Sequence, residues 1–362
     1  MKFWRVIIAT LFATLTLCGC AKTGEVKFME GDLGRLFNDE RNKIFNYCPS
    51  ILQDGEERYV YYCSNDVSGL VFDHVYVRKG TKNRRGKWVY SQPSVALAPT
   101  KDAFDDMHCC DPTVIKGEFK LNDQTYTYLM AYTGNSTSVD NKVGLAVSNS
   151  PMEGWVKVSD KPFIDLNLGV NYWGIGQPSL IYLGEGKALL FCAVGSYQTY
   201  SKVFKYDFSN LNQPVMMEEC DISAKGLLNL NGGQDYMTNG DFAYDSVNKR
   251  LYCISDCHPN PQDGFPSFVG GSFRVTYIPF DIAGQLNQLA MNRWSTLITI
   301  GPGETGFARN SNCGIVTDGS GYTLSSSEME TMYSVSEAAQ VDNFWLYTGT
   351  YRIHGYNILI KE

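Results

Sequence analysis

The chain has 362 residues, with 31 Lys and Arg against 38 Asp and Glu, so its formal net charge is −7. Nucleic-acid partners require clustered basic residues, and the only such cluster is the glycine-containing segment 79–87, so nucleic-acid binding is not expected. Aromatic residues make up 13% of the chain and charged residues only 19%, which suits neutral, hydroxyl-rich ligands as well as β-sheet interiors.

The N-terminus has the pattern of an exported protein. Lys2 and Arg5 precede an apolar run over residues 6–17, which is shorter than the ~20 residues that span a bilayer. The segment 17–20 (LCGC) resembles a bacterial lipobox, in which the last cysteine carries lipid. We expect a lipoprotein signal peptide over 1–19, lipidation at Cys20, a tether over 20–33 and one domain over 34–362. An ordinary cleaved signal is the alternative.

The residue after Cys20 bears on the membrane that would hold the anchor. Ala21 stands there instead of an aspartate retention signal, which favours the outer membrane, with its periplasmic or surface face undecided. The predicted partners are therefore a membrane and a carbohydrate ligand.

One pattern then recurs along the chain. A polar residue precedes a short apolar strand, a turn with Gly or Asp follows, and a second strand is rich in Tyr, Phe or Leu. The copies start roughly every 60 to 70 residues and lie at 46–63, 110–130, 176–192, 239–253 and 312–324. With further strand-like runs after each copy, this predicts an all-β, five-bladed β-propeller with four strands per blade. A β-sandwich would not require a regular period.

The first strand of each propeller blade lines the central channel, so the polar residues at the strand starts should converge on one mouth. Ligand sites are concave and carry a few convergent polar groups, so we predict a binding funnel there. Strand starts also favour Asn and Asp as turn residues, which is the structural alternative. The predicted funnel residues are Asn46, Asp111, Gln177, Asn239, Asp241, Asn310 and Asn312.

The second repeat carries the most specific resemblance to a known family. The segment 110–115 (CDPTVI), followed by 144–151 (GLAVSNSP) and Gly154-Trp155, resembles the five-bladed glycosidases of family 43 and their relatives in families 32, 68 and 117. The resemblance covers all five repeats in outline. It implies acid–base hydrolysis of oligo- or polysaccharides in the central funnel.

The resemblance also implies three carboxylates at the starts of the first three blades: an Asp base, an Asp that tunes the acid, and a Glu acid. Counted from Asn46, these places hold Asn46, Asp111 and Gln177. An amide cannot take up or release the required proton. Three alternatives stay open for the missing groups: Asp241 as partner of Asp111, Glu304 from the segment 301–306, or His108, since a histidine is thought to act in family 117.

Two further residues complete the predicted mouth. Arg309 would bind an acidic group on a sugar, and Trp173 would stack on a ring face. No cofactor is expected, although a Ca²⁺ held by carboxylate and amide oxygens is compatible with the channel. Cys48 and Cys63 flank the turn at 54–57, which suggests a disulfide, whereas the other cysteines show no zinc-binding spacing.

Two functions therefore stay open. The first is a membrane-anchored glycoside hydrolase with Asp111 as base or orienting carboxylate and Asp241 or Glu304 as its acid partner. The second is a carbohydrate-binding propeller that has lost the acid and the base. The amides at positions 46 and 177 favour the second function, whereas Asp111-Pro112 favours the first.

Overall fold

The computed structural model describes residues 26–28, 46–65, 72–137, 139–168, 172–196, 199–262, 269–336 and 351–360. The predicted signal peptide, Cys20 and most of the tether lie outside these residues, so lipidation stays a prediction. None of the helices within the described ranges is long and apolar enough to cross a membrane.

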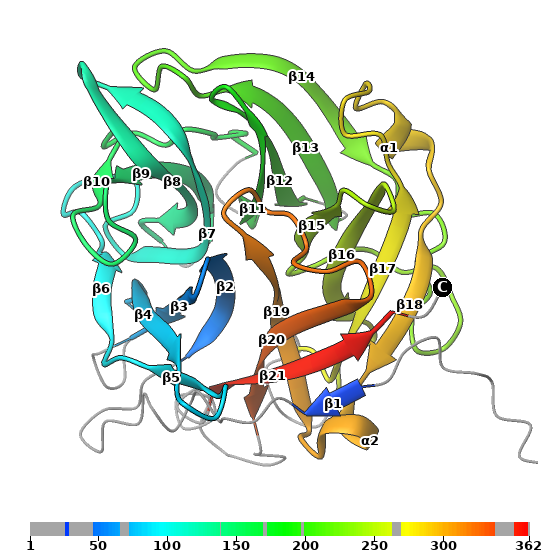
Figure 1. Ribbon diagram of the computed structural model, residues 1–362. Helices are drawn as coiled ribbons and strands as arrows, with labels where there is room; N and C mark the ends of the chain where they lie inside the picture. The colour runs from blue at the N-terminus through cyan, green and yellow to red at the C-terminus, as the bar shows by residue number, and fades with distance from the viewer. Residues whose placement is uncertain are drawn as a thin grey trace, which may run out of the picture.

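The regular secondary structure of the described residues is almost all β-strand, and the strands form antiparallel groups around a central axis (Figure 1). The first group has β2 (Tyr47–Asp54), β3 (Glu57–Ser64) and β4 (His74–Lys82), with β5 (Trp88–Tyr90) and β6 (Ser94–Leu97) both paired to β4. The second has β7 (His108–Leu121), β8 (Gln124–Asn135), β9 (Lys142–Ser148) and β10 (Val156–Lys157).

The third group has β11 (Gly174–Gly184), β12 (Lys187–Gly195), β13 (Thr199–Asp207) and β14 (Val215–Ile222). The fourth has β15 (Asp241–Asp245), β16 (Arg250–Cys257), β17 (Ser272–Pro279) and β18 (Ser295–Ile300), with the short helices α1 (Gln288–Met291) and α2 (Pro302–Thr305) beside it.

The last group joins the two ends of the chain. It has β19 (Arg309–Asp318), β20 (Glu328–Ser336) and β21 (Arg352–Leu359), and β1 (Val26–Phe28) pairs with the outer strand β21. A parallel pairing of β19 with β2 connects this group to the first one in a single nine-stranded sheet. The strand pairing thus divides into five groups, and the all-β propeller predicted from the repeats is confirmed.

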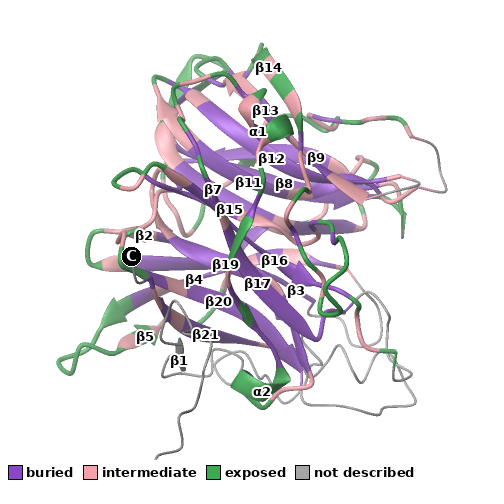
Figure 2. Cartoon of the chain, turned by 90° about the vertical axis from the view of Figure 1, so that its right-hand side faces the viewer, coloured by how far each residue is buried: buried purple, intermediate pink, exposed green. Residues whose placement is uncertain are grey.

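The hydrophobic core follows the same division. Five clusters of buried apolar residues occur, and each contains side chains from two neighbouring groups. For example, Leu129 and Val147 of the second group pack in one cluster with Leu180 and Leu190 of the third. Figure 2 shows the buried colour along most of the strand lengths and the exposed colour mainly in the turns. Burial of apolar area between adjacent sheets therefore holds the ring together.

The innermost strands share one backbone feature that positions the site. One residue in each strand or just before it has a left-handed φ between 46° and 51°: Cys48, Asp111, Gln177, Asn239 and Asn312. In β2, β7, β11 and β19 the pairing register shifts at this residue, as in a β-bulge. Bulges re-aim a side chain, and all five residues line one small cavity on the axis.

Candidate functional site

A cavity of about 720 Å³ lies over the axis, and the five left-handed residues line it as well. Its volume is within the range of small-molecule sites. Its walls carry aromatic side chains, among them Tyr47, Trp173, Tyr236 and Tyr351, and neutral amides and hydroxyls. None of the described residues that line it is Lys or Arg. The cavity is therefore suited to a neutral polar ligand with apolar ring faces.

Asp111 is the single carboxylate among the five left-handed residues. It is partly exposed on the cavity floor, and its Oδ1 accepts from the Cys110 thiol at 3.3 Å. Burial raises the pKa of Asp111 above its usual value, and hydrogen bonds from Cys48, Cys110 and Thr133 oppose that rise. A carboxylate with a raised pKa is a better proton acceptor than a free one, as a general base requires.

A histidine paired with a buried aspartate lies on the same side of the cavity. His108 begins β7, and its Nδ1 is 2.9 Å from Oδ2 of Asp73, which stands just before β4. Asp73 is 3% exposed, and both residues line the cavity. A carboxylate bonded to one ring nitrogen fixes the orientation of the imidazole.

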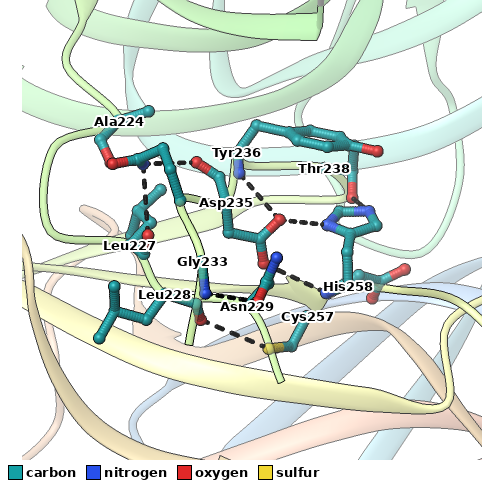
Figure 3. Close-up of polar contacts among 12 residues, drawn as sticks. Ala224, Leu227, Leu228, Asn229, Gly233, Asp235, Tyr236, Thr238, Cys257 and His258 are labelled. Carbon is teal, nitrogen blue, oxygen red and sulfur yellow. Dashed lines mark hydrogen bonds and ion pairs between the residues drawn. The ribbon is translucent and has the colours of Figure 1, made fainter. Parts of the chain in front are cut away.

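A second pair of this kind comes from the fourth group and from the segment between β14 and β15 (Figure 3). Nδ1 of His258 lies 2.8 Å from Oδ1 of Asp235, and Nε2 lies 3.2 Å from the Thr238 hydroxyl. The Tyr236 ring stacks on the His258 ring at 4.1 Å between centroids. Asp235 also accepts from the buried Arg274 guanidinium at 2.6 Å, and its pKa falls to about 2. Asp235 is therefore ionised and holds His258 in place.

A hydrogen-bonded network connects Gln177 and Asn239, two of the five left-handed residues that line the cavity. The amides of Gln177 and Asn239 bond to each other, and Asn239 Nδ2 donates to Asp256 Oδ2 at 2.7 Å. Asp256 also accepts from the Ser311 hydroxyl at 2.7 Å and from the Asn312 backbone N–H at 3.1 Å. Burial raises the pKa of Asp256 to about 6. The network fixes Gln177 and Asn239 as rigid polar groups for a ligand.

The small axial cavity, of about 40 Å³, gives little support for the Ca²⁺ that the sequence left compatible with the channel. The side-chain oxygens of Gln177, Asn239 and Asp241 already accept hydrogen bonds from their neighbours. These bonds already hold the three side chains within the ring, so none of these contacts points to a calcium ion.

Several predicted residues lie at the cavity, and others do not. Asp111, His108, Trp173, Gln177, Asn239 and Asn312 all line it. Asn46 does not: it is fully buried, its Oδ1 accepts from Ser64, and Cys48 takes the place expected for it. The register was wrong by two residues because the left-handed position comes just before Pro49, as it comes before Pro112 and Pro178 in the next two groups.

Asp241, one of the predicted acids, lines only the small axial cavity. Its Oδ1 accepts from the Ser179 hydroxyl at 2.7 Å and its Oδ2 from the Ile315 N–H at 2.8 Å, so it links three groups of strands. Burial raises its pKa to about 6. These hydrogen bonds give Asp241 a structural role in the ring.

Three more predicted residues lie away from the cavity. Glu304 is exposed in α2, where its side chain accepts a hydrogen bond from the Gly301 N–H at the start of the helix. Arg309 is 1% exposed and lines neither cavity. Asn310 is fully buried and donates to the carbonyls of Gly271 and Phe307. Glu304 precedes β19, and Arg309 and Asn310 begin it, which is why the sequence pattern indicates them, but their side chains do not reach the large cavity.

The site also contains residues that the sequence analysis missed. Cys48, Asp73, Tyr236 and His258 line the cavity, but no motif marks them. His258 is one of only four histidines in the chain, and it closely follows Asp256 at the end of an apolar strand. This juxtaposition is the sequence feature that could have indicated a functional role for His258. Cys48 and Cys63 are free thiols, so the suggested disulfide is not formed.

Comparison with known proteins adds information on the fold. No protein-family model matches the chain. No curated protein matches it in sequence. A family 117 glycoside hydrolase of the marine bacterium Zobellia galactanivorans superposes with a TM-score of 0.57 at 12% identity, over 93% of this chain and 91% of that one. The α-L-arabinofuranosidase of Podospora anserina, solved with cellotriose, gives 0.55 at 12% identity over 93% and 97%.

A β-xylosidase structure gives a TM-score of 0.54 at 10% identity, over 91% of this chain and 94% of that one. Identities this low establish a shared fold and leave the chemistry to the site itself. The resemblance to the propeller glycosidases, inferred from the second repeat, is thereby confirmed at the level of the fold.

Proposed function

We propose that this protein is a glycoside hydrolase that acts on a neutral oligosaccharide in the 720 Å³ cavity. The observation that carries the proposal is the meeting of Asp111 with two histidines, His108 and His258, in one cavity. Each histidine bonds to a buried aspartate. The enzymes that share the fold, an arabinofuranosidase and a xylosidase among them, supply the class of substrate to test.

In this mechanism Asp111 is the general base that activates water, and a histidine donates a proton to the leaving oxygen. An inverting hydrolase needs the two groups on opposite sides of the bond, about 6.5–9.5 Å apart. His258 belongs to the fourth group and Asp111 to the second, so they reach the cavity from different walls. His108 shares strand β7 with Asp111, which makes it the alternative acid.

The acid can be identified from the leaving group. A p-nitrophenolate departs without a proton, whereas a sugar alkoxide needs one. We therefore expect His258→Asn to retain hydrolysis of p-nitrophenyl α-L-arabinofuranoside or β-D-xyloside and to lose oligosaccharide hydrolysis by ~10²-fold or more. Asp111→Asn should lose both activities, and Glu304→Gln, whose side chain is exposed away from the cavity, should keep both. If His108→Asn shows the selective loss instead, His108 is the acid.

The second candidate function, sugar binding without hydrolysis, is favoured by Cys48 and Gln177 at the two positions where the resemblance implies carboxylates. Calorimetric titration with the same oligosaccharides separates the two functions. If the protein only binds sugar, the parent and Asp111→Asn should bind it with equal affinity, and neither should hydrolyse it. Trp173→Ala should weaken the affinity by roughly tenfold or more in both cases, which is about 1.4 kcal/mol, because it removes an aromatic face from the cavity wall.

A further inference from the structure

Three cysteines from three strands meet beside Asp111. Cys48 lies on β2, Cys63 on β3 and Cys110 on β7. The sulfurs of Cys48 and Cys63 and a carboxylate oxygen of Asp111 all lie within 4.8 Å of one another. The sulfur of Cys110 is 2.7 Å from that of Cys63 and 3.3 Å from Oδ1 of Asp111. Cys63 and Asp111 thus each lie close to both Cys48 and Cys110, so three sulfurs and one carboxylate are gathered in one place.

We propose that Cys48, Cys63, Cys110 and Asp111 bind one thiophilic divalent cation, such as Zn²⁺, at the floor of the cavity. Zinc prefers four ligands in a tetrahedron, chosen from Cys sulfur, His nitrogen and carboxylate oxygen. With Zn–S bonds of about 2.3 Å, neighbouring sulfurs lie about 3.8 Å apart. The sulfurs of Cys63 and Cys110 would have to separate by about 1 Å, which small side-chain rotations supply.

The groups around the sulfurs suit a thiolate site. The backbone N–H of Asp111 donates to the Cys63 sulfur at 2.9 Å, and the Tyr47 hydroxyl lies 3.1 Å from the Cys110 sulfur. Such bonds orient ligands and tune the metal in known sites.

The site also has an entry path. Cys48, Cys110 and Asp111 line the large cavity, and no Lys or Arg among the described residues faces it to repel a cation. This site could not be predicted from the sequence, because positions 48, 63 and 110 have no zinc-like spacing and are brought together only by the ring. If Asp111 is the base of the proposed hydrolase, a bound cation would occupy it and inhibit hydrolysis, but binding itself is measured without any substrate.

The test uses the full-length protein, reduced, desalted and kept under argon. We expect it to retain one Zn²⁺ per chain by elemental analysis. Titration with Co²⁺ should produce sulfur-to-metal charge-transfer absorption in the near ultraviolet, and Zn²⁺ should abolish it. Cys63→Ser and Cys48→Ser should each weaken the absorption and lower zinc retention. Cys220→Ser, which changes a partly exposed thiol on β14, should change neither.

Three results would overturn the proposal. The first is a parent protein that retains no zinc and gives no Co²⁺–thiolate absorption. The second is equal absorption in the parent and in folded Cys48→Ser, where the circular dichroism spectrum verifies folding. The third is a Cys63–Cys110 disulfide, found by peptide mapping of protein isolated without reductant, that persists in the presence of excess zinc.

Discussion

Stability should fall as the pH rises from 4.5 to 6.5, and Asp241 should be one of the groups responsible. Its pKa is about 6 in the folded chain against 3.8 for a free aspartate. A group whose folded pKa is raised stabilises the fold below its unfolded pKa, and that contribution disappears as the pH rises through the folded value. A shift of about two pH units corresponds to about 3 kcal/mol in total. Near pH 5 the loss is about 1 kcal/mol per pH unit.

Urea unfolding at several pH values measures this slope directly. Asp241→Asn cannot titrate, so the free energy of unfolding of the variant should depend on pH less steeply than that of the parent, by about 1 kcal/mol per pH unit near pH 5. In Asp241→Asn the side-chain nitrogen cannot accept the hydrogen bond that the Ile315 N–H donates to Asp241 Oδ2. This loss lowers the free energy of unfolding equally at every pH, so it does not change the slope. The control is Asp123→Asn, in an exposed turn. Equal slopes in the parent and in Asp241→Asn would refute the reasoning.

Two more predictions concern the second histidine pair and the N-terminus. Asp235→Asn should destabilise the chain by about 3–5 kcal/mol, because it removes the carboxylate beside the fully buried Arg274; an unchanged urea midpoint would contradict this. If Cys20 carries lipid, Cys20→Ala should move the protein from the membrane fraction to the soluble fraction of the cells, and an identical distribution of the parent and the variant would argue against the anchor.

The fold could be predicted from the sequence because the ring repeats one local pattern. Each copy places a turn between an inner strand and its neighbour, as at Asp54-Gly55 and Glu185-Gly186, and the period of the copies indicates the blades. The pairing of β1 with β21 could not be predicted, since three residues carry no periodicity. The same limit applied to β5, β6 and β10, which are short strands at the outer edges.

The site could be predicted only in part, for a geometric reason. Asp111, Gln177, Asn239 and Asn312 were identified because they stand at the starts of the repeats, and the structure brings all four to one cavity. In the first repeat the predicted residue, Asn46, lies two positions before the equivalent one, which is Cys48. Cys48 is not a polar turn residue, so a pattern of polar strand starts does not include it, although Pro49 follows it as Pro112 follows Asp111. The left-handed φ that all five positions share shows that they are equivalent.

The two histidine pairs change how the missing carboxylates should be interpreted. Neither Cys48 nor Gln177 can replace a catalytic carboxylate, so Asp111 is the one carboxylate among the five left-handed residues. Additional acid–base groups come from other positions: His108 from the beginning of β7, on the same inner strand as Asp111, and His258 from the loop after β16. Each is oriented by an aspartate that is 3% exposed, and Asp235 in addition pairs with the buried Arg274. Buried aspartates are costly unless they are bonded, so two such pairs facing one cavity favour proton transfer over passive sugar binding.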